Sequence, residues 1–253
     1  MEKDSVLEMR HIYKTFPGVK ALQNVDFTLK KGEIHALMGE NGAGKSTFMK
    51  ILMGEYDSDA GTIELNGKEV HFTDSHQALS NGISMIFQEM SPFPNLTVAE
   101  NMYIGREPHK LHFLKKKELR EKAKAQLKKL NISLNIDTPV KNLTVSEMQL
   151  LEIAKAVSYQ SQIVIMDEPT AALDPLAEYD LYKKLVLLMH GRLSFFISHR
   201  LASGKFCDRI LVFSKHTIQE DGSHDQLMNL KGLYAEMYSR QAEFYKRDNL
   251  SES

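Results

Sequence analysis

Residues 39–46 restrict the possible folds of this chain more than any other segment. They read Gly-Glu-Asn-Gly-Ala-Gly-Lys-Ser and fit the pattern G-x-x-x-x-G-K-[ST] at every fixed position. An apolar run at 34–38 precedes them, and a helical pattern begins near Lys45. A glycine-rich turn between a strand and a helix lets backbone N–H groups surround a phosphate, and the helix N-terminus favours the negative charge. The segment therefore predicts a loop that binds the phosphates of a nucleotide.

Two side chains of this loop have predicted roles. The Lys45 ammonium is expected to reach the β- and γ-phosphates, and the Ser46 hydroxyl is expected to bind Mg²⁺. We therefore expect ATP and Mg²⁺ as cofactors. The predicted nucleotide-binding residues of this segment are Gly39, Glu40, Asn41, Gly42, Ala43, Gly44, Lys45, Ser46 and Thr47.

Short apolar runs alternate with helical stretches along the chain, and marked turns separate them. Helical periodicity at 114–130 and 147–157 predicts two amphipathic helices. Asn66-Gly67 predicts a hairpin. This order predicts an α/β P-loop NTPase fold with a mostly parallel core sheet, an antiparallel hairpin region near the N-terminus and a helical subdomain. Strands are predicted at 25–29, 34–38, 63–65, 83–87, 163–166, 195–198 and 210–213.

Length and composition limit the domain organisation and the partners. We predict a single domain over 1–253, in which 1–90 and 161–245 form the ATPase core and 91–160 forms the helical subdomain. The net charge of -1 and the single Cys207 favour neither a nucleic-acid partner nor an internal disulfide. No apolar run approaches the roughly 20 residues that cross a bilayer, and the first residues do not resemble a secretory signal. We therefore expect a cytoplasmic protein that reaches a membrane through a partner.

Two carboxylates follow the apolar run at 163–166, where Asp167 and Glu168 come directly after four apolar residues. Such a run is typical of a strand buried on both faces. In open α/β sheets, ligands bind at the carboxyl ends of the strands. We therefore expect Asp167 to hold Mg²⁺ and Glu168 to orient the water that attacks ATP.

Together with three further stretches, these motifs resemble the nucleotide-binding domains of ABC transporters over nearly the whole chain. The further stretches are Lys-Thr-Phe-Pro-Gly-Val-Lys-Ala-Leu at 14–22, Asn-Leu-Thr-Val-Ala-Glu-Asn at 95–101 and Glu-Ile-Ala-Lys-Ala at 152–156. Residues from about 6 to 168 are most similar to the first ATPase half of sugar importers of the ribose and galactose type.

The resemblance implies roles for three more residues. Phe16 matches the aromatic residue that stacks on the adenine, with Tyr13 as an alternative. Gln88 matches a glutamine that contacts Mg²⁺ and senses the transmembrane partner, and His199 matches the histidine that contacts the γ-phosphate. The implied catalytic residues are Glu168, His199 and Gln88, and the implied metal ligands are Ser46, Gln88 and Asp167.

Residues 143–149, Leu-Thr-Val-Ser-Glu-Met-Gln, occupy the place of the family's leucine-serine-glycine-glycine-glutamine signature. The resemblance implies that this segment faces the nucleotide bound by a second subunit. We expect Ser146 to cap the following helix, with Gln149 three residues later as in a capping box. The positive end of that helix would then point at the γ-phosphate across the dimer. The implied signature residues are Thr144, Val145, Ser146 and Glu147.

From about 169 to 245 the chain is more similar to the ATPase domains of peptide or bacteriocin exporters. The stretches concerned are Ala-Ala-Leu-Asp-Pro-Leu-Ala-Glu-Tyr at 171–179, Ser-His-Arg-Leu-Ala-Ser at 198–203 and Gly-Leu-Tyr-Ala-Glu-Met at 232–237. Asp174 matches the family's D-loop aspartate, which communicates across the ATPase dimer. We interpret the chain as a mosaic with an importer-like front and an exporter-like back.

The resemblance implies the ATP-hydrolysing subunit of an ABC membrane transporter. We expect sugar import because Gln88, which should face the membrane partner, lies in the importer-like part; a peptide exporter is the alternative. The implied partners are a second ATPase subunit, permease subunits and a substrate-binding protein. The implied location is the inner face of the cell membrane.

Three other classes of protein share a phosphate-binding loop. A soluble ABC ATPase acting on DNA or ribosomes is one alternative. The predicted helix at 114–130 is rich in lysine, but Glu118 and Glu121 reduce its positive charge, and we predict no nucleic-acid partner. A phosphate-loop kinase accounts less well for Gln88 and His199. A regulatory module that only binds ATP is compatible with the altered signature, but Glu168 favours hydrolysis.

Overall fold

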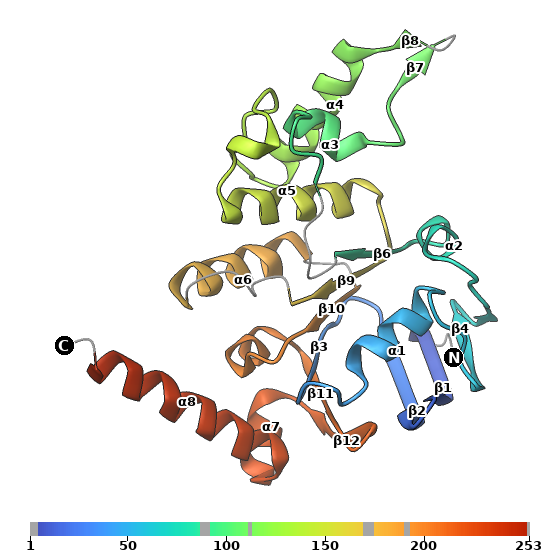
Figure 1. Ribbon diagram of the computed structural model, residues 1–253, viewed down its shortest axis with the longest axis vertical. Coiled ribbons are helices and arrows are strands. Elements are labelled where there is room, and N and C mark those ends of the chain that lie inside the picture. The colour runs from blue at the N-terminus through green and yellow to red at the C-terminus, as the bar shows by residue number, and fades with distance from the viewer. Residues whose placement is uncertain (1–4, 87–91, 111–112, 169–174, 190–192, 252–253) are drawn as a thin grey trace.

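The structure, a computed structural model, describes residues 5–86, 92–110, 113–168, 175–189 and 193–251 (Figure 1). Its centre is a six-stranded sheet in the order β12-β11-β3-β10-β9-β6. Neighbouring strands run parallel, except that β12 is antiparallel to β11. The strands of this sheet are β3 (Ile34–Gly39), β6 (Ile83–Ile86), β9 (Ile163–Asp167), β10 (Leu193–Ile197), β11 (Arg209–Ser214) and β12 (Thr217–Gly222).

The inner strands of this sheet are buried on both faces. Every residue of β3 and β10 is buried, and so are the first four residues of β9. Continuous apolar runs are typical of parallel strands that are covered on both sides. The structure therefore confirms the predicted mostly parallel core sheet.

A four-stranded antiparallel sheet in the order β2-β1-β4-β5 is formed mostly by the N-terminal part of the chain. Val25, Phe27 and Leu29 of β2 are buried and alternate with more exposed residues, as predicted. Asn66 and Gly67 both have positive φ and connect β4 to β5, which confirms the predicted hairpin. The strands are β1 (Ser5–Phe16), β2 (Val19–Lys30), β4 (Ala60–Leu65) and β5 (Lys68–Glu69).

The segment between β6 and β9 is largely helical and lies beyond the β6 edge of the central sheet (Figure 1). We predicted a helix from residue 114, but the helix begins at Lys116 because Phe113 and Leu114 pair in a short hairpin. The elements are α3 (Val98–Tyr103), β7 (His109–Lys110), β8 (Phe113–Leu114), α4 (Lys116–Lys129), the 3₁₀ helix η1 (Val140–Asn142) and α5 (Val145–Ser158).

Helices cover both faces of the central sheet. Leu37 and Ile165 pack in one apolar cluster with α1 and the antiparallel sheet, whereas Val164 and Phe196 pack in another with α5 and α6. Within the described ranges, no helix is long and apolar enough to cross a membrane. The other helices are α1 (Lys45–Leu52), α2 (Ser75–Ser80), α6 (Pro175–Met189), the 3₁₀ helix η2 (Leu201–Phe206), α7 (His224–Leu230) and α8 (Leu233–Ser251).

Candidate functional site

The loop between β3 and α1 requires glycine at two positions. Gly39 and Gly44 have φ angles of 145° and 108°, which side chains rarely adopt. A Cβ atom at Gly39 would lie 2.2 Å from the carbonyl oxygen of Phe213, and one at Gly44 would lie 2.5 Å from that of Ala21. The loop is therefore packed tightly against β11 and β2, and α1 begins directly after it at Lys45.

Lys45 is held beneath this loop. Its side chain is buried, and Nζ donates hydrogen bonds to the carbonyl oxygens of Gly39 at 2.8 Å and Glu40 at 2.9 Å. Burial lowers the pKa of Lys45, while the charges of Glu168 and Asp167 oppose that shift. The ammonium and the two carboxylates therefore share one electrostatic environment.

Asp167 ends β9 in a partly buried position. Burial raises its pKa to about 6, the charge of Glu168 adds to the rise, and Lys45 and Lys50 oppose it. Ionisation of Asp167 is therefore costly in the protein even with Lys45 and Lys50 nearby. A divalent ion bound beside it would favour the ionised form.

This shift predicts the effect of Asp167→Asn on stability. The folded protein keeps the Asp167 proton up to about pH 6, whereas an unfolded chain releases it near pH 3.9. Ionisation of Asp167 therefore lowers the free energy of unfolding as the pH rises from the pKa in the unfolded chain to the pKa in the folded protein. We expect Asp167→Asn to raise that free energy by roughly 1–2 kcal/mol at pH 7, after allowance for partial exposure, and by less at pH 5. Urea unfolding of the nucleotide-free protein at both pH values measures this.

Asp57→Asn is the control for that experiment, because the Asp57 side chain is 75% exposed and its neutralisation should change the unfolding midpoint little. A less stable Asp167→Asn protein at pH 7 would contradict the assigned cost of the buried charge.

Glu168 and His199 meet at the carboxyl ends of two neighbouring strands. Asp167 lies opposite Ile197 in the parallel pair of β9 and β10, and the Glu168 N–H donates to the Ile197 carbonyl at 2.9 Å. Glu168 has a φ of 46°, an unusual value for a residue with a side chain. Its Oε1 lies 2.7 Å from Nδ1 of His199. Two predicted catalytic residues that are 31 positions apart are therefore in direct contact.

A residue of the last helix supports His199. The Gln241 amide in α8 donates to the His199 carbonyl at 3.1 Å and accepts from the Leu201 N–H at 2.7 Å. The loop after β10 is therefore tied to the C-terminal helix. Gln241 has no role that the sequence predicts, since its distance along the chain from His199 hides this contact.

A cleft of about 500 Å³ lies over the loop and the strand ends. Phe16, at the end of β1, lines one side of it, and the ring of Tyr56 packs edge-on against Phe16 with centroids 5.3 Å apart. Val19 and Ala21, for which the sequence predicts no role, also line the cleft. The residues that line it are Phe16, Val19, Ala21, Asn41, Gly42, Gly44, Lys45, Ser46, Thr47, Asp167 and Glu168.

The cleft contains most of the predicted nucleotide-binding residues from one subunit. Gly39, Glu40 and Ala43 do not line the cleft, although the carbonyl oxygens of Gly39 and Glu40 accept hydrogen bonds from Lys45. His199 contacts Glu168, which lines the cleft. Gln88 and Asp174 lie outside the described residues.

The predicted cap of the signature helix is wrong by two residues. Thr144, not Ser146, is the N-cap of α5: its hydroxyl accepts from the Glu147 N–H, and the Glu147 carboxylate accepts from the Thr144 N–H at 2.8 Å. Thr-Val-Ser-Glu itself fits the capping-box spacing, so the extended backbone at Thr144 starts the helix earlier. Ser146 lies inside the first turn. The signature residues do not line the cleft of their own chain.

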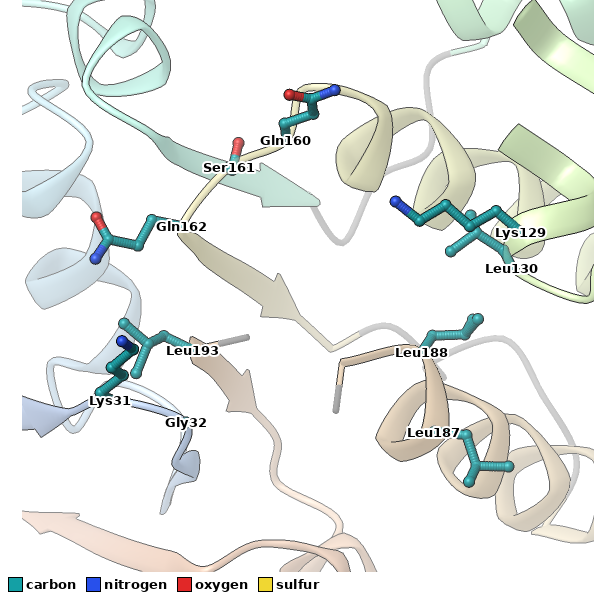
Figure 2. A pocket seen from close by; sticks show the side chains of 10 residues that line it. All are labelled: Lys31, Gly32, Lys129, Leu130, Gln160, Ser161, Gln162, Leu187, Leu188 and Leu193. Carbon is teal, nitrogen blue, oxygen red and sulfur yellow. The ribbon is translucent and has the colours of Figure 1, made fainter. Parts of the chain in front are cut away.

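A second cavity of about 510 Å³ lies at the opposite ends of the same strands (Figure 2). Gly32 precedes β3, Gln162 precedes β9 and Leu193 begins β10, so this cavity is at their amino ends. Ligands of open α/β sheets bind at the carboxyl ends. The cleft at Lys45, not this cavity, is therefore the candidate site.

The loop and the strand ends fit a nucleotide with Mg²⁺. The glycines keep side chains away from the loop backbone, and a buried ammonium lies beside it. The Ser46 hydroxyl and the Asp167 carboxylate line the same cleft, and both are oxygen ligands that Mg²⁺ accepts together with phosphate oxygens.

Known ATP-binding proteins of sugar importers are similar to this chain. The chain is 45% identical over 234 residues to the galactose/methyl galactoside import ATP-binding protein MglA 1 of Photobacterium profundum. The matched region covers 89% of this chain and 47% of that protein. It is 44% identical over 212 residues to the ribose import ATP-binding protein RbsA 2 of Burkholderia cenocepacia. This match covers 83% of this chain and 42% of that protein. The chain thus spans a little under half the length of these relatives. The first alignment is longer than 6–168, so the similarity to sugar importers continues into the back part, whose exporter likeness stays a prediction.

A solved structure and a family model give the same assignment. The ADP conformation of an ATP-binding cassette of an ABC transporter matches with a TM-score of 0.81 and 27% identity, covering 93% of this chain and 99% of that chain. The family model described as ABC transporter matches residues 22–171, which is more than half of the chain. This protein therefore belongs to the ATP-binding family of ABC transporters.

Proposed function

We propose that this chain binds ATP with Mg²⁺ and hydrolyses it to power a membrane transporter that imports a sugar of the galactose or ribose type. The observation that carries the proposal is the meeting of Lys45, Asp167 and Glu168 at one cleft, with His199 hydrogen-bonded to Glu168. Such a set can bind the phosphates, hold the metal ion and orient a water molecule.

The loop and Lys45 would bind the phosphates. Backbone N–H groups at the start of α1 and the helix dipole favour the negative charge. The Lys45 ammonium would exchange its hydrogen bonds to the Gly39 and Glu40 carbonyls for phosphate oxygens. Phe16 would stack on the adenine, and Thr47 lines the cleft beside Ser46. Mg²⁺, held by Ser46 and Asp167, would neutralise charge on the phosphates.

Glu168 would act on the attacking water. Its carboxylate lies beside Lys45 and Asp167 and is oriented by His199, so it can accept a hydrogen bond from a water placed at the γ-phosphate. His199 is half-exposed on this side of the molecule. It can therefore contact both Glu168 and the γ-phosphate.

A second subunit would complete the site. Thr144, Val145, Ser146 and Glu147 lie at the N-terminus of α5, which would face the γ-phosphate bound by the partner subunit. Asp174 and Gln88, by resemblance, would communicate across the dimer and with the permease. ATP would then hold two subunits together, and hydrolysis would release them.

The proposed substrate rests on the relatives. The two import proteins above are named for galactose or methyl galactoside and for ribose. A permease and a substrate-binding protein are the corresponding partners, and the chain would work at the inner face of the cell membrane.

Sugar uptake by intact cells tests this function. Cells whose only copy carries Lys45→Ala should lose most uptake of labelled galactose or ribose, because the variant binds the nucleotide that drives transport much more weakly. Uptake of an unrelated solute, measured in the same cells, should stay unchanged. Normal uptake of both sugars would rule out sugar import, while the ATPase assay with purified protein would still report on hydrolysis.

Glu147→Gln tests the trans role of the signature helix. Glutamine can accept the same hydrogen bond from the Thr144 N–H, so the cap remains, but the negative charge at the positive end of α5 is removed. We expect half-maximal ATP-dependent dimerisation at a roughly two- to fivefold lower ATP concentration. Light scattering after size exclusion measures it.

Glu121→Gln is the matched control for Glu147→Gln, because it removes one charge from the exposed side of α4. If both variants shifted dimerisation equally, the effect would come from net charge and not from the signature helix.

A further inference from the structure

The short hairpin of the helical segment exposes apolar side chains to an unusual degree. His109 lies opposite Leu114 and Lys110 opposite Phe113 in the pairing of β7 with β8. Phe113 is 80% exposed and Leu114 is 41% exposed. The hairpin projects from the end of the helical segment that is farthest from the central sheet (Figure 1). A side chain such as Phe113 gains nothing from this position in water, so the exposed pair suggests a contact with another surface.

Lysines surround the two apolar side chains. Lys110 precedes them, and Lys115, Lys116 and Lys117 follow at the start of α4; all four are exposed. The nearby carboxylate of Glu118 is already engaged, at 2.9 Å from Lys115 and 3.1 Å from Lys122. The local charge is therefore positive, although the chain as a whole carries a net charge of -1.

We propose that this basic hairpin, made of Lys110, Phe113, Leu114, Lys115, Lys116 and Lys117, binds the surface of a membrane that contains anionic lipids. Exposed Phe and Leu side chains can enter the boundary between headgroups and acyl chains. Lysines beside them reach the anionic headgroups with their flexible stems. The combination distinguishes this surface from the rest of α4, where lysines stand without exposed large apolar neighbours.

Charge complementarity favours lipid over nucleic acid or a protein partner. Phosphate groups of nucleic acid would satisfy the lysines, but the duplex backbone offers Phe113 and Leu114 no apolar layer to enter. An acidic protein segment would have to provide both carboxylates and a pocket for Phe113. A lipid surface provides both types of contact at once. The contact would fix the helical segment against the membrane beside the transporter, independently of whether the chain hydrolyses ATP.

Co-sedimentation of the full chain with lipid vesicles tests the proposal. The protein should sediment with vesicles of phosphatidylcholine mixed with phosphatidylglycerol, and not with vesicles of phosphatidylcholine alone. Phe113→Ser, and separately the replacement of Lys115, Lys116 and Lys117 by Ser, should each lower the bound fraction several-fold. Salt near 1 M, where charges are screened over roughly 3 Å, should release most of the protein.

Two controls separate the hairpin from general charge and general apolar exposure. Replacing Lys124, Lys128 and Lys129 by Ser removes the same charge from the same helix, and Leu187→Ser removes a side chain that is 75% exposed on α6. Both should bind the vesicles as the parent does. ATP binding should be unchanged in every variant, since none of these residues lines the cleft.

Three outcomes would overturn the proposal. The first is equal sedimentation with both kinds of vesicle. The second is an equal loss of binding in the control variants. The third is a hairpin variant that still binds vesicles as the parent does but no longer supports uptake in cells, which would assign the hairpin to a protein partner instead.

Discussion

Glu168→Gln should leave ATP binding nearly intact and lower the ATPase rate by about two to three orders of magnitude. The glutamine side chain fills the same space at the end of β9, and the Lys45 ammonium keeps its hydrogen bonds to the Gly39 and Glu40 carbonyl oxygens. It cannot accept a proton from the attacking water, and loss of such a group typically lowers the rate by roughly 10²–10⁴-fold. Phosphate release at saturating ATP gives the rate, and a fluorescent nucleotide analogue gives the affinity.

The same variant reports on the dimer. If ATP joins two subunits and hydrolysis separates them, Glu168→Gln should accumulate as a dimer with ATP and stay monomeric with ADP. His199→Ala serves as a comparison, because it removes the partner 2.7 Å from Glu168 but keeps the carboxylate, and it should slow hydrolysis less. Equal turnover of Glu168→Gln and the parent would remove Glu168 from its proposed role.

Local sequence signals predicted the parts of the fold that local physics decides. The runs at 34–38 and 163–166, apolar apart from His35, became buried parallel strands, since strands covered on both faces are typically rich in apolar residues. Asn66-Gly67 formed a hairpin because both residues accept positive φ. The phosphate loop was predictable because its glycines, Lys45 and Ser46 follow a fixed spacing between an apolar run and a helical pattern.

Helix boundaries depended on competition between nearby signals. Ser146 with Gln149 and Thr144 with Glu147 both fit a capping box, and the earlier pair forms the cap. At residue 114 the helical periodicity was outweighed by the pairing of Phe113 and Leu114 with β7. In both places the sequence is compatible with two starting points for the helix, which lie two residues apart.

Contacts between distant segments could not be predicted from spacing alone. The Glu168–His199 hydrogen bond depends on the neighbouring placement of β9 and β10, and the Gln241 contact depends on where α8 packs. Val19 is a local case that the sequence pattern did not reveal: it pairs with Phe16 across the tight turn between β1 and β2, and both residues line the cleft. Family resemblance supplied the role of His199, but only the structure gives its partner.

Lys45→Ala should weaken nucleotide binding by at least one to two orders of magnitude. The ammonium lies beneath the loop, 2.8 Å from the Gly39 carbonyl oxygen, where a bound phosphate can take over its hydrogen bonds. A hydrogen bond between charged groups contributes about 1.5–3 kcal/mol, which corresponds to roughly 10- to 100-fold in affinity. Isothermal titration with ATP and Mg²⁺ measures the change.

Loss of folding is not the expected reason for that weakening. Burial lowers the pKa of Lys45, which means that the buried charge costs free energy in the nucleotide-free protein. The alanine variant should therefore unfold at a temperature close to that of the parent when no nucleotide is present. With ATP added, the parent should gain more thermal stability than the variant at the same ATP concentration, because the stabilisation by a ligand grows with its concentration relative to Kd.

Lys50→Ala provides the matched control for Lys45→Ala. Lys50 lies on the same helix, and its charge also acts on Asp167, but its side chain packs over the ring of Tyr56 and does not line the cleft. This variant should keep its ATP affinity within a few-fold of the parent, since it loses only a screened charge. Unchanged ATP binding by Lys45→Ala, or equal losses in both variants, would contradict the assignment of residues 39–46 as the phosphate-binding loop.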